Sequence, residues 1–420
     1  MTAEEHGGTA PTARPRVQPP ESPQIQGKPS VAVQAFNSMS GDSEQEYFSD
    51  GISEDIITDL SKVSGLHVIA RNSSFVYKGA AVSIPQVAEE LGVRYLLEGS
   101  VCKAGNRVRV AAQLVDSTNG GHIWADRFDR DLTDIFDVQD ELTREIVSAL
   151  ELTLNAGDRD RLAHKRMVDI EAYNLFLRGR EHTWLHSRQG NIAARELLAR
   201  AVEITPGFAA AHARIAFTHV IDYANGWAED PENSLRVGLE LARRAVEMDE
   251  GEPQSHFSLS VALLWSREHT PALAEALRCI ELEPNSAEGY LVGAHVHIFG
   301  GDATEAIEMI DTYMTLDPIY PDIVLHFLAE AHISLRQFDQ AVDILKRRLE
   351  KAPESATSST LLAACYGHLG KLEESRAAWA NTQRINPEFS LERRRRVLPF
   401  KDPADFELRI EGLRMAGIVD

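Results

Sequence analysis

Cysteine is scarce in this 420-residue sequence, and its three copies, Cys102, Cys279 and Cys365, lie far apart. No two of them form a CxxC pair, so the sequence predicts neither a zinc ribbon nor a disulfide framework. We expect three reduced thiols in a reducing compartment, and therefore a cytoplasmic protein. Long apolar runs are also missing. No stretch approaches the roughly 20 apolar residues that a membrane-spanning helix needs, and the N-terminus has no apolar signal-peptide core.

Basic residues are outnumbered by acidic ones. Forty-three Lys and Arg stand against 64 Asp and Glu, which gives a formal charge of −21. Because nucleic acids are bound mainly through Lys and Arg that displace counterions, this balance predicts no nucleic-acid partner and no general affinity for anionic membranes. The remaining composition, 43% hydrophobic and 25% charged, is typical of a folded globular protein.

Short motifs that accompany common enzyme chemistry are missing as well. Neither GxxxxGK[ST] nor GxGxxG occurs, and there is no GxSxG nucleophile elbow. His182 and His186 stand four residues apart, as two ligands on one helix face would, but neither an HExxH motif nor a third ligand follows. Arg71 and Lys78 can hold an anion, although such residues more often cap or pair at strand ends. We therefore predict no catalytic residue, no cofactor and no metal site.

One acidic segment, SGDSEQEYFSDG at 40–51, follows the first predicted strand, where α/β proteins often carry their chemistry. Its GDS triplet resembles the start of the nucleophile motif of GDSL-type esterases, with Ser43 as the nucleophile. Such a serine needs a histidine base, which these esterases commonly supply from a late DxxH motif. No DxxH occurs in this chain, so the esterase interpretation lacks its base.

The same segment has oxygen ligands at calcium-loop spacing. The candidates are Asp42, Glu44, Glu46 and Asp50. Tyr47 stands where a calcium loop needs glycine for its sharp turn, and Ser53 stands where it needs a bidentate glutamate. An EF-hand is thereby excluded, and a weak divalent-cation site stays open. The favoured interpretation is structural: Asp50 or Ser53 caps a helix that starts here.

Strand-like and helix-like patterns alternate up to residue 155. Residues 1–28 hold five prolines and almost no large apolar side chains, so this tail is predicted to be disordered. Residues 29–155 show the order β-α-β-α-β-β-β-α, which predicts an α/β module, a small mixed sheet with helices. The predicted elements are strands at 30–36 and 66–71, helices at 52–63, 83–93 and 131–152, and three antiparallel strands within 94–128.

The second half of the chain repeats. Successive helix-ending segments close at Pro206, Glu250, Pro284, Pro318, Pro353 and Pro387, at intervals of 44, 34, 34, 35 and 34 residues. A ten-residue insertion, YANGWAEDPE, accounts for the longer first interval. A small residue lies 12 positions before each end, and another lies 24 positions before four of the ends. Because helices that approach closely need small side chains at the contact, this pattern predicts stacked helix pairs.

This pattern resembles the tetratricopeptide repeat, and the resemblance implies an all-α solenoid of about six helix pairs over residues 170–388. The closing segment 389–420, which carries four arginines at 393–396, is expected to cover the apolar face of the last repeat. Its arginines are expected to face solvent or an acidic partner. In this family the first helix of each pair lines a concave groove. Transferring the usual groove positions gives Phe217, Ile221, Trp265, His295, Phe299, His326, Glu330 and His368, a set that suits peptide or protein recognition.

The module at 29–155 resembles the TolB N-terminal-like (FlgO-like) domain. The resemblance rests on two segments, KPSVAVQAFNSMSGDSEQEYFSDGISEDIITDLSKVSGLHVIARNSSFVYKG and LGVRYLLEGSVCKAGNRVRVAAQLVDSTNGGHIWADRFDRDLTDIFDVQDEL. Ser43 departs from the family, whose members usually carry proline there. In bacteria this module often precedes tetratricopeptide repeats. The combination commonly forms the C-terminal part of class III adenylate/guanylate cyclases or of winged-helix transcriptional regulators, and LPFKDPADFELRIEGLRMAG is similar to the end of the cyclase-type proteins.

Only 27 residues precede the resemblance, which is too few for a cyclase catalytic domain or a winged-helix domain. We therefore expect the sensory or scaffolding half of such a regulator: a non-enzymatic protein that binds a peptide or protein in its groove. The alternative is a regulatory component that acts in trans on a class III adenylate/guanylate cyclase. An unknown small ligand on the α/β module is left open.

Overall fold

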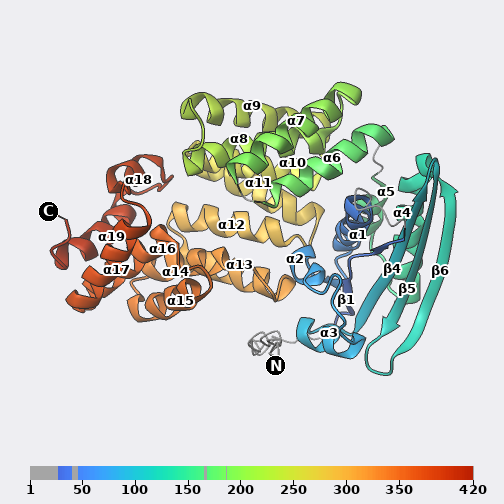
Figure 1. Cartoon of the computed structure of the whole chain (residues 1–420), viewed down its shortest axis with the longest axis horizontal. Helices are drawn as coiled ribbons and strands as arrows, with labels where there is room; N and C mark the ends of the chain where they lie inside the picture. The colour runs from blue at the N-terminus through green and yellow to red at the C-terminus, as the bar shows by residue number, and fades with distance from the viewer. Residues whose placement is uncertain (1–26, 40–45, 165–167, 186, 420) are drawn as a thin grey trace, which may run out of the picture.

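The computed structural model describes residues 27–39, 46–164, 168–185 and 187–419 (Figure 1). Nearly all of the tail that is predicted to be disordered lies outside these residues. A mixed sheet stands at one end of the molecule, and a long run of helices extends from it to the other end. The predicted fold class, an α/β module followed by an all-α tetratricopeptide-repeat solenoid, is confirmed.

The sheet has the order β3-β1-β4-β5-β6, and β2 also pairs with β4. Its strands are β1 (Ser30–Val33), β2 (Asn37–Ser38), β3 (His67–Val68), β4 (Tyr95–Ala104), β5 (Arg107–Asp116) and β6 (Gly121–Asp131). Strand β1 pairs in parallel with β3 and β4, whereas β4, β5 and β6 form an antiparallel meander. The three antiparallel strands predicted within 94–128 are joined by tight reversals at Gly105 and Gly120, both of which have positive φ.

Helices cover both faces of the sheet around β1. Helices α1 (Glu46–Ser61) and α4 (Ile135–Ala149) share one core with Val31 and Val33, while α3 (Ile84–Leu91) shares another with Ala32. Successive side chains of a strand point to opposite faces, so a strand that is buried on both faces is apolar throughout. Two further helices were not predicted: α2 (Arg71–Phe75), which follows β3, and α5 (Ala156–Ala163), which follows α4.

Helix α1 begins at Glu46, earlier than predicted. The predicted capping role of Asp50 and Ser53 is therefore wrong, since both lie inside the helix. The physical reason is Phe48, which is buried in the sheet core and extends the apolar face of the helix towards its N-terminus. Instead of capping, the Ser53 hydroxyl accepts a hydrogen bond from the backbone N–H of Phe36 at 2.8 Å, which ties the helix to the loop between β1 and β2.

Six helix pairs follow the module. They are α6 (Ile170–Thr183) with α7 (Arg188–Ile204), α8 (Ala209–Asn225) with α9 (Pro231–Met248), α10 (Pro253–Trp265) with α11 (His269–Leu282), α12 (Ala287–Gly300) with α13 (Ala303–Leu316), α14 (Ile323–Ser334) with α15 (Phe338–Lys351), and α16 (Ala356–His368) with α17 (Leu372–Ile385). The first helices of neighbouring pairs contact one another, so they form a continuous inner layer. Within the described ranges, no helix has the length and hydropathy to cross a bilayer.

The small residues at the repeat positions lie where helices meet. Ala272, Ala306 and Ala341 have no exposed surface, and the equivalent Gly238 is buried on α9. A Cβ atom on Gly238 would lie only 2.8 Å from a methyl carbon of Val220 on the partner helix. The prediction that these positions need small side chains for close helix approach is confirmed.

The module and the solenoid are joined by hydrogen bonds between distant parts of the chain. Asn285, in the loop after α11, donates through its side chain to the carbonyls of Ser61 and Val63 at 3.2 Å each and accepts from the Val68 N–H at 3.4 Å. Asp317, which ends α13, accepts a hydrogen bond from the Ser73 hydroxyl. The segment from the end of α1 to α2 is therefore fixed on the third and fourth helix pairs.

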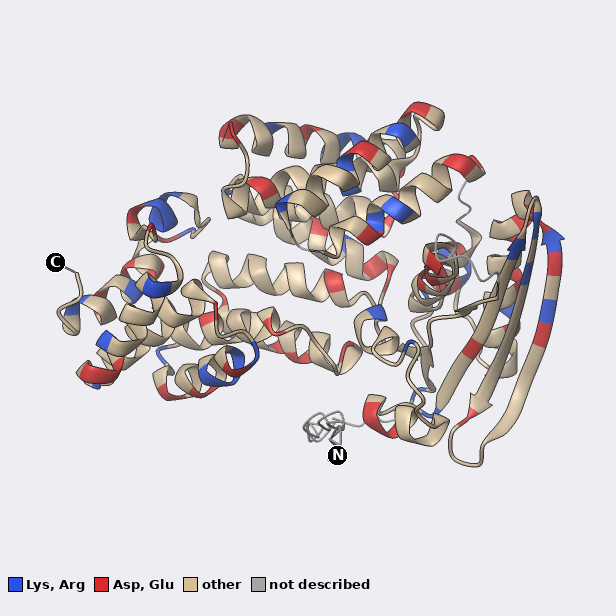
Figure 2. Cartoon of the chain, viewed as in Figure 1, with Lys and Arg blue, Asp and Glu red and all other residues tan. Residues whose placement is uncertain are grey.

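Two helices close the chain, α18 (Leu391–Val397) and α19 (Pro403–Met415). We refer to residues 391–419 as the C-terminal segment. Helix α19 lies against α16 of the last pair, where Gly367 and Gly412 cross so closely that a Cβ on Gly367 would be 1.7 Å from the Gly412 carbonyl oxygen. Helix α18 is rich in arginine positions, which are blue in Figure 2.

Candidate functional site

The eight predicted groove residues all lie on or at the end of first helices, because a period of about 34 residues returns each repeat position to the same place on the next pair. Helix α8 carries Phe217 and Ile221, α10 carries Trp265, α12 carries His295 and Phe299, α14 carries His326 and Glu330, and α16 carries His368. Phe299, His326 and Glu330 are buried, and the other five are partly exposed. We call this layer of first helices the inner face.

Ring contacts connect the middle of the inner face. The Phe299 ring centroid lies 6.3 Å from that of Trp265 and 6.1 Å from that of His295. His295 meets Phe327 edge-on at 3.7 Å, and Phe327 lies 5.8 Å from His326. Sequence reasoning missed Phe327, although it directly follows a predicted groove residue. The result is a continuous row of aromatic and imidazole rings across three helix pairs, of which Phe299 and His326 are buried.

The remaining predicted residues lie towards the two ends. The ring of Phe217 lies 5.4 Å from that of Phe257, and Ile221 follows it one turn later on α8. At the other end, His368 stacks on Phe338 with ring centroids 4.2 Å apart. The His368 ring also donates to the Leu408 carbonyl at 2.7 Å. The structure therefore brings the central residues together and leaves His368 with the C-terminal segment.

The C-terminal segment lies on the inner face well beyond the last repeat. Phe400 packs edge-on against Phe299 at 4.8 Å between ring centroids, and the Lys401 N–H donates to the Phe299 carbonyl at 2.8 Å. Phe400 and Phe406 belong to the same buried core as residues of α8, α10 and α12. The segment thus contacts helix pairs that precede it by more than one hundred residues, and not only the last pair.

Two side chains after α10 hold the main chain of this segment. Arg267 donates to the carbonyls of Arg396 and Leu398 at 2.9 Å each and of Phe400 at 3.1 Å, while His269 donates to the carbonyl of Pro399 at 2.6 Å. Carbonyl groups are common to every residue, so these contacts recognise a chain conformation more than a particular sequence. The turn from α10 to α11 therefore holds the main chain of the C-terminal segment next to the first helices.

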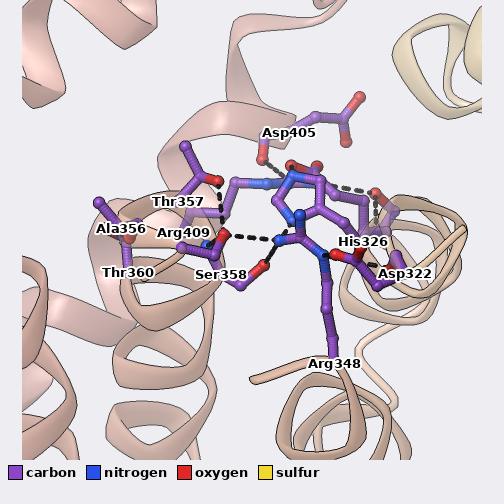
Figure 3. Close-up of polar contacts among 12 residues, drawn as sticks. Asp322, His326, Arg348, Ala356, Thr357, Ser358, Thr360, Asp405 and Arg409 are labelled. Atoms are coloured by element: carbon purple, nitrogen blue, oxygen red, sulfur yellow. Dashed lines mark hydrogen bonds and ion pairs between the residues drawn. The ribbon is translucent and has the colours of Figure 1, made fainter. Parts of the chain in front are cut away.

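A polar cluster lies under α19 (Figure 3). Arg409 donates to a carboxylate oxygen of Glu330 at 2.6 Å, and both side chains are almost completely buried. His326 lies with Nδ1 3.0 Å from the Ser358 hydroxyl and Nε2 3.6 Å from Glu330. Arg348 of α15 also donates to the Ser358 hydroxyl. The cluster joins α14, α15 and α16 to the C-terminal segment.

Burial decides the ionisation of this cluster. It lowers the pKa of His326 to about 3, and it lowers the pKa of His295 to about 4. For Glu330, burial acts against ionisation, but the charge of Arg409 holds its pKa below the usual value. Both imidazoles are therefore neutral near pH 7, and His326 is too weak a base for proton transfer there.

The acidic segment and its neighbours form ion pairs where the structure describes them. Lys78 pairs with Glu46 at 2.8 Å and with Asp50 at 2.7 Å, while Arg71 pairs with Glu54 at 2.9 Å. Asp42, Ser43, Glu44 and His186 lie outside the described residues. Across the described part of the chain, no group of three or more His, Cys, Asp and Glu side chains is arranged to hold a metal ion.

Sequence reasoning missed the residues by which the C-terminal segment binds, namely Phe400, Phe406 and Arg409. For Phe400 and Phe406 the signal was the presence of large apolar side chains within a strongly charged segment, because such side chains need a surface to cover them. Three of the four consecutive arginines are exposed, as expected for a solvated face, whereas Arg394 turns inward. Burial lowers the pKa of Arg394, and Glu330 partly offsets this effect.

Two family models match parts of the chain. Residues 300–365 match a tetratricopeptide-repeat model, which confirms the predicted repeats. Residues 28–145 match a model described as "HilA/YgeH-like transcriptional regulator, second domain". The α/β module is thus matched to a different family description from the TolB N-terminal-like domain that the sequence resembles.

A protein of Rhizobium meliloti (strain 1021) named "Putative adenylate cyclase 3" is 51% identical to this chain over 253 residues. The matched stretch covers 60% of this chain and 43% of that protein, so this chain spans less than half of its relative. Among solved structures, the chain is similar to Pseudomonas aeruginosa pilF, with TM-score 0.39, 19% identity and coverage of 53% of this chain and 95% of that one. It is also similar to a thermophilic TPR protein of Thermus thermophilus, with TM-score 0.37, 19% identity and coverage of 46% and 98%.

Proposed function

We propose that this chain is a non-enzymatic interaction protein that binds a peptide or protein partner along the inner face of its solenoid. The observation that supports this most is that the inner face already holds a polypeptide. Phe299 and Glu330 of the inner face bind side chains of the C-terminal segment, and Arg267 and His269, in the turn from α10 to α11, hold its main-chain carbonyls. A surface that binds one segment in this way has the chemistry to bind another.

The proposed contact surface divides into two parts. Phe217, Ile221, Trp265 and His295 are partly exposed while the C-terminal segment is in place, so they are the first contacts that a partner can make. The second part, Phe299, His326, Glu330 and His368, is covered or bonded by the segment. A partner that uses the second part has to displace the C-terminal segment. Its apparent affinity is then reduced in proportion to the fraction of molecules in which the segment is released.

Partner capture with matched variants tests this proposal. Trp265→Ala is expected to reduce capture roughly tenfold or more, because truncating a central aromatic anchor commonly costs about 2 kcal/mol. The control is Leu277→Ala, which removes an exposed apolar side chain from the outer helix α11. If both variants are folded and capture the partner equally well, the inner face is not the partner-binding surface.

A second candidate is a regulatory component that acts in trans on a class III adenylate/guanylate cyclase. It is supported by the name of the Rhizobium meliloti relative and by the resemblance of residues 29–155 to the TolB N-terminal-like module of such proteins. Purified chain with ATP and Mg²⁺ or Mn²⁺ is expected to form no cyclic nucleotide. A changed rate when the chain is added to a class III cyclase would favour the second candidate, and product formed by the chain alone would refute both.

A further inference from the structure

A cavity of about 140 Å³ lies at the junction of the module and the solenoid, away from the C-terminal segment. Helices α1 and α2 form one wall, and the first helices α6, α8, α10 and α12 supply most of the others. Figure 1 shows α1 and α2 beside this part of the solenoid. Aromatic side chains and several charged groups line the cavity, and none of them was among the predicted groove residues.

Some of these charges neutralise one another. Glu54 pairs with Arg71 at 2.9 Å and with Arg180 at 3.2 Å, and Arg180 also pairs with Asp55 at 3.1 Å. The last pair is buried, and the Tyr173 hydroxyl donates to the same Asp55 carboxylate. These four charged groups form a closed network that ties α1 to α6. The two positive and two negative charges balance, so this network does not need the charge of a ligand.

Arg214 on α8 is different. Only 5% of its surface is exposed, and its Nη2 donates to the Gln254 side-chain oxygen at 2.8 Å. Its Nε has no hydrogen-bond partner within the described residues, and no carboxylate among them lies within ion-pair distance. A buried guanidinium without a direct ion pair is costly, and Glu288 and Glu54 stabilise its charge only without direct contact, so this side chain has unused capacity to bind an anionic group.

Two carboxylates that line the same cavity also lack an ion pair among the described side chains. Glu252 is 7% exposed and accepts from the Gln254 N–H at 3.3 Å. Glu288, at the start of α12, has its pKa raised by burial, an effect that Arg214 partly offsets. Glu283 also lines the cavity and has an interaction partner of its own. Apart from Glu283 and the four paired charges, the cavity presents one cation and two carboxylates without an ion pair among the described side chains, and both carboxylates interact with Arg214 without direct contact.

An aromatic wall stands beside Arg214. The indole of Trp184 lies between two guanidinium groups, 5.2 Å from that of Arg71 and 5.9 Å from that of Arg214. Phe257 lines the cavity from α10. Apolar surface next to separated charges of opposite sign is complementary to a small molecule that carries both charges and a side chain.

We propose that this cavity binds a small zwitterion of the α-amino-acid type, with its carboxylate on Arg214 and its ammonium group towards Glu252 and Glu288. The side chain of the ligand lies against Trp184 and Phe257. A dianion is disfavoured by the two carboxylates, and a simple cation is disfavoured by Arg214. Because the cavity has walls from both the module and the solenoid, binding stabilises their junction. The proposal does not depend on partner binding at the inner face.

The test uses the full chain and the free proteinogenic L-amino acids, with thermal unfolding and tryptophan fluorescence as readouts. At least one amino acid is expected to raise the unfolding temperature and to change the fluorescence of Trp184. The methyl ester of the best binder, which lacks the carboxylate, and its N-acetyl form, which lacks the ammonium group, are each expected to bind roughly 10- to 100-fold more weakly.

Variants assign the effect to the cavity. Arg214→Met is expected to abolish the thermal shift, whereas Arg236→Met, at an exposed position on α9, retains it. Trp184→Phe keeps the thermal shift and loses the fluorescence change. Should Arg214→Met not fold, Glu288→Gln serves instead, with weaker binding of the free amino acid expected. Three results would each overturn the proposal. They are the absence of a thermal shift with any amino acid, equal binding of the free and N-acetyl forms, and full binding by a folded variant at position 214 or 288.

Discussion

At the scale of single residues, burial decides what the predicted inner-face side chains do. Their place on the first helices could be predicted, because the period of the repeat fixes it. Their burial could not, because the residues that cover them lie far along the chain: Phe400 covers Phe299, and Arg409 covers Glu330. Two side chains that the repeat pattern marks for partner contact thus already have intramolecular partners.

The buried ion pair gives a first prediction. Arg409→Ala leaves the Glu330 carboxylate buried without its counter-charge, and we expect it to lower the free energy of unfolding by about 3–5 kcal/mol. Arg395→Ala is the matched control, since Arg395 and Glu407 form an equally short but half-exposed pair, at 2.7 Å, for which we expect at most about 1 kcal/mol. Urea denaturation measures both. Similar losses for the two variants would contradict the assigned role of burial.

The neutral imidazole of His326 gives a prediction for pH. Its pKa is about 3 in the folded protein against 6.5 in an unfolded chain, so the unfolded state binds the proton first as the pH falls. This residue therefore favours folding above pH 6.5, and its contribution is lost progressively towards pH 3. Between pH 7 and 5 we expect it to account for about 2 kcal/mol of lost stability.

Urea denaturation at both pH values, for the wild type and for His326→Gln, measures this contribution. The variant is expected to lose less stability on acidification than the wild type. An identical loss would show that His326 does not carry the effect. His332→Gln is the matched control for the substitution itself, because His332 is a partly exposed imidazole on the same helix.

At the scale of elements, the repeat was predictable and the long-range helix contacts were not. The small residues that recur every 34 positions mark contacts between neighbours in sequence, such as Gly238 with Val220. Gly412 and Gly367 carry no such period, because α19 returns to α16 only once. The start of α1 was missed for a related reason: Phe48 extends the helix through a contact with the sheet core, not through a local capping signal.

The glycine crossing gives a prediction for α19. Gly412→Ala places a Cβ atom 2.2 Å from the Ala364 carbonyl oxygen, so α19 has to move away from α16. We expect faster hydrogen exchange and faster proteolysis across residues 391–419. The control is Gly300→Ala on α12, where a Cβ meets no atom within 4 Å. Unchanged protection of the C-terminal segment in Gly412→Ala would contradict the close crossing.

At the scale of the whole molecule, the module and the solenoid were predicted as separate parts and are found joined. The junction depends on contacts such as the Asn285 side chain with Val68 and with the Ser61 carbonyl, which link positions more than 200 residues apart. Such contacts produce neither a repeat period nor a short motif in the sequence, so they could not be predicted from it. The cavity beside the junction was missed for the same reason, since its walls come from both parts.

Asn285 provides the prediction for the junction. Asn285→Ala leaves the buried carbonyls of Ser61 and Val63 without their side-chain donor, and we expect a loss of about 2–4 kcal/mol. Faster hydrogen exchange is expected at the end of α1 and in β3. Asn225→Ala, an exposed position whose side chain donates to its own helix, is the control and should change neither. If hydrogen exchange becomes faster only in the solenoid, the result would contradict the proposed coupling of the two parts.

A partner that binds on the inner face is expected to compete with the C-terminal segment. Site-specific photo-crosslinking in cells tests this most directly, with the crosslinking residue placed at Trp265 and, for comparison, at Leu277 on the outer face. We predict a discrete partner adduct from position 265, none from position 277, and a higher yield from 265 when Gly412→Ala releases the segment. Equal adducts from both positions, or none from 265 in the folded Gly412→Ala protein, would contradict binding on the inner face.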